Sequence, residues 1–453
     1  MKIFHTSDWH LGRTLHGADL TPAFEQWADF LVEFVRTEQI DAVLISGDIY
    51  DRGVPPITMV QLLSETLARL TEHTHVIMTS GNHDSASRLG FGRALMRPNV
   101  SIHTDSLESG HPIPVLNADG ELGALIYAIP YLDPDMERRK LAPTTASSPA
   151  SNFPASDSPA SAASTVDSSS TGDLPTGDID VSTHTDAPHS QQPPLLARSH
   201  EAVMQGALAR VQADLAAGVG AELVSQREEI PRIIMAHAFV TGGESSDSER
   251  DIRVGGVDSV PTRLFALRDS KGEALIDYVA LGHLHGPQRV NREHEPLMRY
   301  SGSPIAFSFS EEHQQKSGVL LTFSAHSRTP HVDLIQAPVY RTLSSLRGSL
   351  DDFLGTSFDA YRENFVRAYV TDPSRPPNLF AQLKARFPYV LDVHHEHPTV
   401  QIQQSSERVT RLDPLDMLRD FFATNGGSEL TDTEDRLLSS LWERYQSAHR
   451  GAE

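Results

Sequence analysis

An alternation of short apolar runs and amphipathic stretches over the first 80 residues is the strongest constraint on the fold of this 453-residue chain. Ile3–Thr6, Ala42–Ser46 and His75–Ser80 have the apolar character of buried β-strands. Between them, Thr21 and Pro22 begin one amphipathic helical pattern, and a second pattern follows Pro55 and Pro56. This order of strands and helices predicts an α/β architecture in which crossover helices connect parallel strands.

The part of the chain after residue 230 has a different pattern. Short apolar runs are separated by turns rather than by helical patterns, at 233–236, 278–281, 297–300, 319–323 and 332–335. We therefore expect the sheet to gain antiparallel members there. Beyond residue 337, two predicted strands flank one helix, and two further helical patterns end the chain.

Composition divides the chain further. Residues 142–195 are dominated by Ser, Pro, Ala and Thr, and such a segment cannot bury enough apolar surface to offset the entropy of ordering it. We predict that it is a disordered insertion. The expected organisation is a core domain in two parts (1–141 and 196–336), the insertion (142–195), an α+β domain (337–405) and C-terminal helices (406–453).

Charge and residue content exclude several classes of protein. The 38 basic and 60 acidic residues give a net charge of −22, so any binding to nucleic acid must depend on local features. The absence of cysteine excludes thiolate chemistry and leaves His, Asp, Glu and Asn as metal ligands. No apolar run is long enough to span a bilayer, and the N-terminus lacks the pattern of a secretory leader. We expect a cytoplasmic protein without a membrane contact.

Polar side chains follow five of the predicted strands directly. The carboxyl ends of neighbouring strands in an α/β sheet converge on one crevice, so these side chains are expected to face one another. A single aspartate or histidine in such a place is usually an ordinary hydrogen-bonded residue, and the signal lies in five clusters occurring together. The clustered residues are Asp8, His10, Asp48, Asn82, His237, His283 and His285.

These residue types suit a centre that holds two divalent cations. Two cations about 3.5 to 4 Å apart repel each other, and a shared carboxylate, for which Asp48 is the natural candidate, reduces that repulsion. The negative charges of Asp8 and Asp48 would offset only part of the charge of the two cations. The pocket would therefore stay positively charged and attract a phosphodiester. Neutral imidazole and amide ligands complete the set, and this mixture of nitrogen and oxygen donors suits Mn, Fe or Zn.

Three further positions carry candidate roles. His83 precedes Asp84, so an imidazole held by a carboxylate could stabilise the reacting phosphorus or protonate the leaving oxygen. Asp51 could orient a metal ligand. Arg52 could bind a phosphate oxygen, or it could simply pair with Asp51.

The same residues resemble a known family. Asp8-x-His10, Gly47-Asp48-x-x-Asp51, Gly81-Asn82-His83-Asp84, His237 and Gly282-His283-x-His285 are similar to the motifs of calcineurin-like metallophosphoesterases. The stretches at 5–12, 47–56, 280–285 and 300–304 resemble the SbcD family, the nuclease subunits of bacterial SbcCD complexes. The resemblance implies two mixed sheets packed as a sandwich with flanking helices. It also implies that 337–405 is a capping domain that touches DNA.

The resemblance also implies a division of labour in the site. One metal would be held by Asp8, His10, Asp48 and His285, the other by Asp48, Asn82, His237 and His283, with His83 as the catalytic histidine. It further implies Mn²⁺, exonuclease action on duplex DNA from 3′ to 5′, and endonuclease action on hairpins and single strands. These activities serve DNA repair, recombination and replication.

Partners are implied in the same way. They are an SMC-like ATPase of the SbcC type and a second copy of the chain, within a heterotetrameric assembly. The last helices, with Leu437, Leu441 and Trp442, would dock on the ATPase, although these side chains could instead pack on their own domain.

Two other functions remain open at this stage. A phosphomonoesterase or protein phosphatase of the same superfamily would use a similar site, although the third motif of serine/threonine phosphatases usually ends in Glu rather than in a residue such as Asp84. A non-catalytic scaffold that only binds an ATPase would not require the complete ligand set.

Overall fold

The structure is a computed structural model that describes residues 1–143, 195–226, 229–249, 259–290, 296–325, 327–396, 415–419 and 431–449. The chain forms two compact units, Met1–Tyr340 and Arg341–Glu453. The predicted insertion at 142–195 lies almost wholly outside the described residues.

The first sheet of the larger unit has six strands in the order β14-β13-β1-β4-β5-β6. Its parallel part consists of β1 (Lys2–Thr6), β4 (Ala42–Ser46), β5 (His75–Thr79) and β6 (Val100–His103). The antiparallel edge consists of β13 (Ser317–Thr322) and β14 (His331–Gln336). The predicted parallel strands and the antiparallel growth of this sheet are confirmed.

The second sheet corrects one expectation. Its order is β11-β12-β10-β9-β8-β7. The four inner strands, β8 (Leu122–Ile129), β9 (Arg232–His237), β10 (Tyr278–Gly282) and β12 (Leu297–Tyr300), are mutually parallel. Only the edge strands β7 (Ile113–Leu116) and β11 (Gln288–Arg289) are antiparallel to their neighbours. The prediction that strands after residue 230 add antiparallel members is therefore wrong for β9, β10 and β12.

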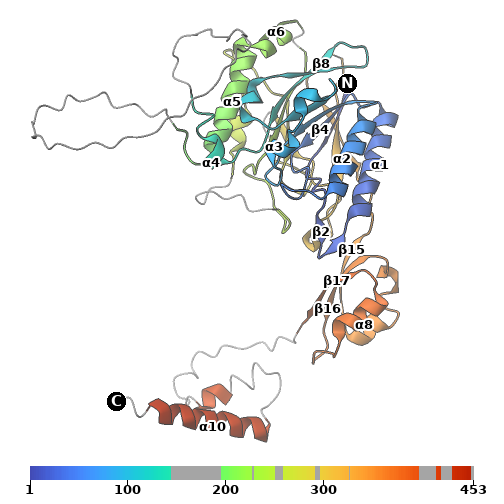
Figure 1. The fold of residues 1–453 in the computed structure, drawn as a ribbon, viewed down its shortest axis with the longest axis vertical. Helices are drawn as coiled ribbons and strands as arrows, with labels where there is room; N and C mark the ends of the chain where they lie inside the picture. The colour runs from blue at the N-terminus through green and yellow to red at the C-terminus, as the bar shows by residue number, and fades with distance from the viewer. Residues whose placement is uncertain are drawn as a thin grey trace, which may run out of the picture. The chain divides into compact units, whose positions relative to one another are not determined.

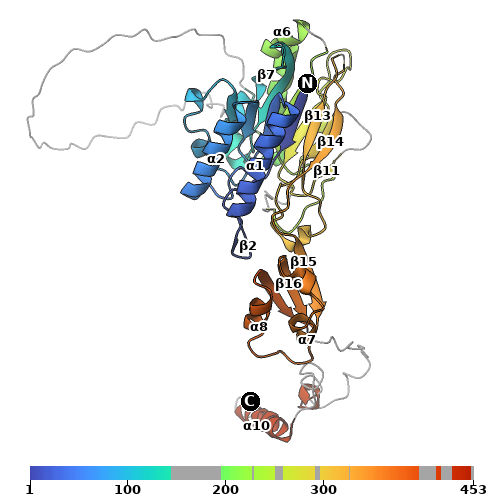
Figure 2. The same cartoon turned by 90° about the vertical axis from the view of Figure 1, so that its right-hand side faces the viewer.

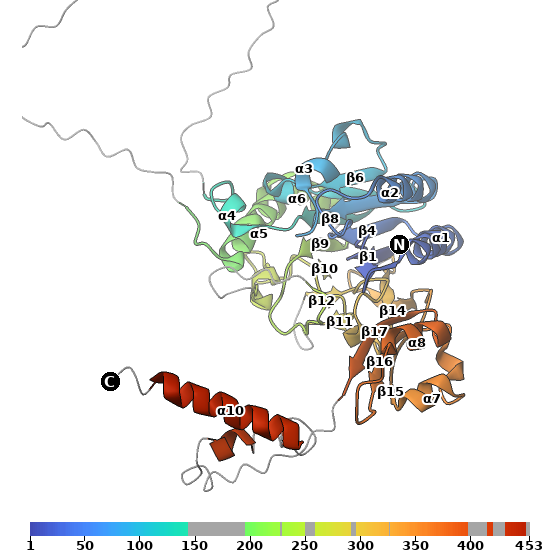
Figure 3. The ribbon, with the colours of Figure 1, turned by 60° about the horizontal axis from the view of Figure 1, so that its bottom comes forward.

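The two sheets pack face to face with helices outside, as Figures 1, 2 and 3 show. α1 (Thr21–Glu38) and α2 (Ile57–Leu70) cover the first sheet, and α5 (His200–Ala217) covers the second. In β1, Ile3 points into the core between the sheets, whereas the Phe4 ring lies 5.2 Å from that of Phe34 in α1. The expected sandwich of mixed sheets is thus observed.

Shorter elements complete this unit. The additional strands are β2 (Thr14–Leu15) and β3 (Ala18–Asp19), and the additional helices are α3 (Ala86–Leu89), α4 (Pro134–Glu137) and α6 (Val219–Gln226). Single 3₁₀ turns lie at Arg93–Leu95, Ser106–Gly110, Thr262–Phe265 and Phe309–Glu311.

The smaller unit contains a parallel three-stranded sheet in the order β15-β16-β17. The strands are β15 (Leu343–Gly348), β16 (Phe365–Val370) and β17 (Val390–His395). They are accompanied by α7 (Leu350–Leu354), a 3₁₀ turn (Asp359–Tyr361) and α8 (Leu379–Arg386). Residues 415–419 are helical, and α10 spans Asp432–His449. Among the described helices, none combines the length and apolar character that crossing a bilayer requires.

Candidate metal centre

The clustered side chains meet at the carboxyl edges of both sheets. Asp8 and His10 follow β1, Asp48 follows β4, and Asn82 follows β5 in the first sheet. His237 ends β9, and His283 and His285 follow β10 in the second sheet. All of these side chains are buried except that of Asn82, which is partly exposed. The sequence predicted one crevice, and the structure builds it from two facing sheets.

One half of the crevice contains Asp8, His10 and His285. One ligand atom from each of these residues lies within 4.8 Å of the other two. The Nε2 atoms of His10 and His285 are 3.0 Å apart. Asp8 is fixed by the backbone N–H of His283, which donates to both carboxylate oxygens at 3.0 and 3.1 Å. These side chains could hold one cation.

The other half contains Asp48, Asn82, His237 and His283. The Asn82 Oδ1 atom lies 2.9 Å from His237 Nε2 and 3.1 Å from His283 Nδ1. The Asp48 Oδ2 atom is 3.4 Å from His237 Nε2 and 3.6 Å from His10 Nε2. Asp48 therefore lies between the two halves, where a bridging ligand would have to be.

The backbone adopts unusual conformations to reach this arrangement. Asp8, His10 and Asp48 have φ angles of 54°, 46° and 49°, in the left-handed region that non-glycine residues rarely adopt. Each such residue carries strain on the order of 1 kcal/mol or more. Hydrogen bonds between the loops hold them, because Asp8 N donates to Gly47 O and His10 N donates to Asp48 O.

Two glycines allow the loops to approach closely. A Cβ atom at Gly81 would overlap the carboxylate of Asp48. One at Gly282 would overlap the backbone carbonyl of Ser46, where β10 of the second sheet meets β4 of the first. These positions therefore require glycine because of close backbone approach.

The protonation pattern of His237 tests whether the site fits a cation. Its Nδ1 atom donates to the carbonyl oxygen of Ser46 at 2.9 Å. A neutral ring would then present an Nε2 lone pair to the Asn82 oxygen, and two acceptors at that distance repel unless positive charge lies near them. Burial alone would lower the pKa of His237, but the negative charge of Asp48 raises it to about 9. The site thus favours positive charge, as a metal centre must.

His83 lies beside the ligands with a defined orientation. Its Nδ1 atom is 2.7 Å from the carbonyl oxygen of Asp51, so this nitrogen carries a proton. Its backbone N–H donates to Asp48 Oδ1 at 2.8 Å, and its ring packs edge-on against His10. One nitrogen of the ring lies within 4.8 Å of ligand atoms of His10 and Asp48, so His83 borders the group of candidate ligands.

Asp84 corrects a prediction. Its carboxylate does not hold His83, and instead accepts the backbone N–H groups of Ile49, Tyr50 and Gly81 at 3.0, 2.9 and 2.9 Å. Burial and the nearby charge of Asp48 raise the pKa of Asp84 to about 7. Asp84 therefore connects the loop after β4 to the loop after β5. The backbone carbonyl of Asp51, rather than the Asp84 carboxylate, holds the ring of His83.

Asp51 and Arg52 lie at the rim of the site. An Asp51 oxygen is 3.9 Å from His10 Nδ1, which is too long for a hydrogen bond. Arg52 lies 3.7 Å from the other Asp51 oxygen, with 63% of its side chain exposed. This geometry favours the pairing of Arg52 with Asp51 over the alternative of a dedicated phosphate ligand.

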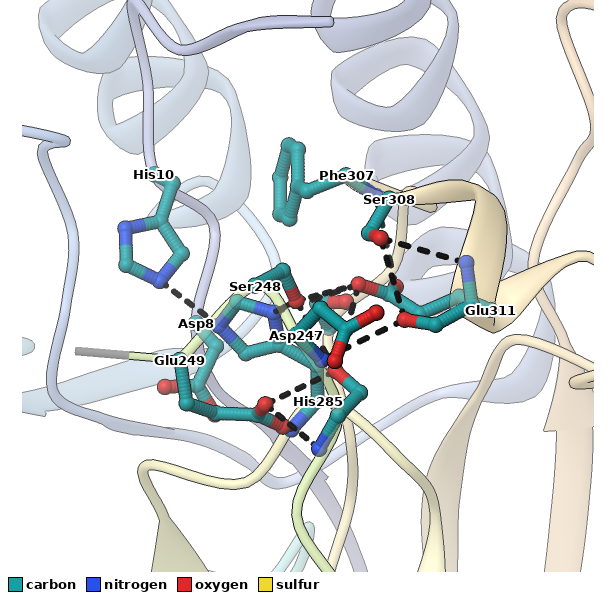
Figure 4. A network of polar contacts seen from close by, with 12 residues as sticks. Asp8, His10, Asp247, Ser248, Glu249, His285, Phe307, Ser308 and Glu311 are labelled. Atoms are coloured by element: carbon teal, nitrogen blue, oxygen red, sulfur yellow. Dashed lines mark hydrogen bonds and ion pairs between the residues drawn. The ribbon is translucent and has the colours of Figure 1, made fainter. Parts of the chain in front are cut away.

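Sequence reasoning missed a group of polar residues that surround His285 (Figure 4). Ser248 and Glu249 come from the loop after β9, and Glu311 and Lys316 from the segment before β13. They follow no strand directly, so the signal that revealed the other site residues is absent from them.

Comparisons with known proteins agree with this geometry. Residues 1–130 match the family model of the calcineurin-like phosphoesterases. Residues 339–425 match a model described as the type 5 capsule protein repressor C-terminal domain, of the SbcD C-terminal type. The chain is 25% identical over 456 residues to the SbcD subunit of the SbcCD nuclease of Staphylococcus saprophyticus, and the match covers 97% of both chains.

Proposed function

We propose that this chain, which belongs to the SbcD family of calcineurin-like phosphoesterases, is the metal-dependent nuclease subunit of an SbcCD-type complex. The observation that carries the proposal is the convergence of nitrogen and oxygen donors from the ends of five strands around Asp48, which lies 3.6 Å from His10 and 3.4 Å from His237. Such a centre suits the hydrolysis of phosphodiester bonds. Because the proposed substrate is DNA, we expect to find the protein in the cytoplasm.

The two groups of side chains would hold two divalent cations. Asp8, His10 and His285 would hold one ion together with Asp48, which lies 3.6 Å from His10. Asp48, His237 and His283 would hold the other together with Asn82, whose oxygen lies near both histidines. Mn²⁺ is the proposed metal, since it accepts both imidazole and carboxylate ligands. When bound, the ions would polarise the phosphodiester and lower the pKa of water.

His83 would act on the leaving group. The hydrogen bond from Nδ1 to the Asp51 carbonyl fixes the ring and leaves Nε2 directed elsewhere. A proton on Nε2 could pass to the oxygen that leaves phosphorus, which replaces an unstable alkoxide by an alcohol. Asp84 serves this step indirectly, because it fixes the loop that carries His83.

The proposed substrate is DNA, with 3′ to 5′ exonuclease action on duplex ends and endonuclease action on hairpins and single strands. The capping domain, predicted at 337–405, would contact it. Four of its six arginines pair with carboxylates, namely Arg341 with Glu363, Arg347 with Glu396, Arg367 with Asp392 and Arg386 with Asp359. Much of the attraction for phosphate must therefore come from the cations and the partner.

The ATPase partner would bind α10. Leu437 and Leu441 are exposed, one helical turn apart, and the rings of Trp442 and Tyr445 stack on each other. An exposed apolar row on a helix is typical of a docking surface. An SbcC-type SMC-like ATPase is the proposed partner.

A second copy of the chain would cover another apolar surface. Ile57 at the start of α2 and Phe91 and Leu95 after α3 are 77%, 84% and 89% exposed. The two segments adjoin, because Arg88 donates to the carbonyl oxygen of Gly53 at 2.8 Å. We propose that this surface forms the dimer within a heterotetrameric assembly. Light scattering should show a dimer that the double substitution of Phe91 and Leu95 by Glu converts to a monomer, and an unchanged dimer would contradict this assignment.

One assay separates the proposed nuclease from a phosphatase. End-labelled blunt duplex and hairpin DNA, a phosphopeptide and a small phosphomonoester are each incubated with the protein and Mn²⁺, with and without the ATPase and ATP. The proposal expects cleavage of DNA that the Asp8→Asn variant abolishes. Turnover of the phosphopeptide or monoester alone would contradict it, and so would inactivity on every substrate.

A further inference from the structure

His285 is the most elaborately held side chain of the metal centre. Its backbone N–H donates to Glu249 Oε1 at 2.8 Å, and its carbonyl oxygen accepts from Lys316 Nζ at 2.9 Å. Its ring atom Nδ1 lies 2.5 Å from the hydroxyl of Ser248, which in turn contacts Glu311. Figure 4 shows Ser248 and Glu249, from one loop, and Glu311, from another segment, around His285. Nothing comparable surrounds the other histidines of the site within the described residues.

The charge state of Glu311 sets the direction of these hydrogen bonds. Glu311 is 1% exposed and lies 2.5 Å from Lys316 Nζ. Its Oε2 atom also accepts the backbone N–H of Phe307 at 3.2 Å, so this carboxyl group faces two hydrogen-bond donors, one of which is a cation. Glu311 is therefore a carboxylate, which can only accept hydrogen bonds.

The direction of the remaining bond follows from counting protons. Ser248 has one hydroxyl proton, and it donates this proton to Glu311. Its oxygen must then accept a proton from Nδ1 of His285. With Nδ1 protonated, the lone pair of the neutral ring lies on Nε2, the atom that is 3.0 Å from Nε2 of His10.

We propose that Lys316, Glu311 and Ser248 form a positioning relay that keeps the Nε2 lone pair of His285 directed at the metal centre. None of the three touches a substrate, so each is a positioning residue. The inference rests on the proposed function, because it assigns the relay to one of the two proposed cation positions.

The loop that carries Ser248 is itself anchored. Arg13, three residues after His10, donates to the backbone carbonyl of Ser248, and its guanidinium lies 5.1 Å from the ring centroid of Phe307. Ser246 donates to Glu249 at 2.7 Å. The loop is thus docked on the first motif and on the segment before β13, and Ser248 is placed rather than free to rotate away.

The test is the binding of Mn²⁺ to the full-length protein, followed by electron paramagnetic resonance and by metal analysis. Ser248→Ala removes the hydroxyl with a small change in volume. Loss of such a contact to a metal ligand lowers metal affinity by about 10- to 100-fold. We expect the Ser248→Ala variant to keep one Mn²⁺ tightly and bind the second at least about 10-fold more weakly, with a mononuclear spectrum at limiting Mn²⁺.

Two matched variants complete the design. Ser248→Thr retains the hydroxyl and should bind both ions as the natural protein does. Ser245→Ala changes an exposed serine of the same loop and should have no effect. Unfolding temperatures without metal establish that all three variants fold. If Ser248→Ala does not fold, Glu311→Gln replaces it, with the same expected loss of the second ion.

The outcomes separate this inference from the proposed function. Two ions bound with unchanged affinity by folded Ser248→Ala, or by Glu311→Gln in its place, would overturn the relay and leave the nuclease proposal standing. Failure of the natural protein to bind Mn²⁺ would instead contradict the proposed function, and the relay with it.

Discussion

Asp48 is the residue on which the proposed centre depends most. It is buried, its Oδ2 atom faces histidines of both sheets, and its Oδ1 atom accepts the backbone N–H of His83. A carboxylate in this place offsets part of the repulsion between two cations. An isosteric amide would keep the shape and lose that charge.

We predict that Asp48→Asn binds less than one Mn²⁺ per chain under conditions in which the natural protein binds two. Metal analysis after gel filtration measures this directly. Asp51→Asn is the matched control, because Asp51 stands 3.9 Å from the nearest ring nitrogen of His10 and should not be needed for metal. Two ions retained by Asp48→Asn would rule out a bridging role.

His83 is expected to behave in the opposite way. Its oriented Nδ1 atom contacts a carbonyl, and a general acid or base contributes typically about 10²- to 10⁴-fold to a rate. His83→Gln should therefore lower turnover by a factor in this range while two Mn²⁺ ions remain bound. His111→Ala, at an exposed histidine, is the control. Loss of metal from His83→Gln would reassign His83 as a ligand.

Some residues of the site could be predicted from the sequence, and others could not. Asp8, Asp48 and His283 could be predicted because each follows a strand end within two residues. The left-handed backbone that aims them could not, because it is imposed by hydrogen bonds between loops distant in sequence. Ser248 and Glu311 were missed because their contact with His285 depends on loop folding alone.

At the scale of elements, the first 80 residues were the most predictable. β1, β4, β5, α1 and α2 lie close to where the apolar periodicity placed them. The parallel pairing of β9, β10 and β12 could not be predicted. A short buried strand has the same apolar pattern whether it pairs in parallel or antiparallel. The turns between these strands suggested antiparallel members, but β9, β10 and β12 pair in parallel.

Asp277, just before β10, provides a pH test away from the metal centre. It accepts the backbone N–H of Arg232 at 2.8 Å and pairs with Arg328 at 2.8 Å. Burial nevertheless raises the pKa of Asp277 above its ordinary value of 3.8. Between pH 3.8 and the raised pKa, the folded state binds more protons at Asp277 than the unfolded state does. The contribution of Asp277 to the free energy of unfolding therefore falls as the pH rises through this range.

We therefore predict a difference in pH dependence for Asp277→Asn. The variant lacks this titration, so the stability of the natural protein relative to it should decrease as pH rises from below 3.8 through the raised pKa of Asp277. Urea unfolding at a series of pH values measures both curves. If the stability of the natural protein relative to Asp277→Asn instead increased with pH, the pairing of Asp277 with arginine would outweigh its burial.

At the scale of the whole molecule, the proposed catalytic and docking functions lie in separate compact units. The proposed metal ligands all fall within Met1–Tyr340, and α10 lies in Arg341–Glu453. A surface change on α10 should therefore affect assembly and leave the chemistry of the site intact.

Charges on the apolar row of α10 should show this separation. We predict that the double variant Leu437→Glu and Leu441→Glu no longer copurifies with the ATPase and keeps two Mn²⁺ ions. Ser440→Glu, which adds charge at an exposed polar position of the same helix, should copurify normally. Copurification of the double variant at the natural level would show that these leucines are not the docking surface.

The central claim is that side chains from two sheets hold a pair of cations that share Asp48. Anomalous diffraction at the manganese edge, from crystals equilibrated with Mn²⁺, measures this most directly. The account predicts two peaks about 3.5 to 4 Å apart, one beside Asp8, His10 and His285 and the other beside Asn82, His237 and His283, with Asp48 touching both. Peaks elsewhere, or a single peak that Asp48 does not contact, would contradict it.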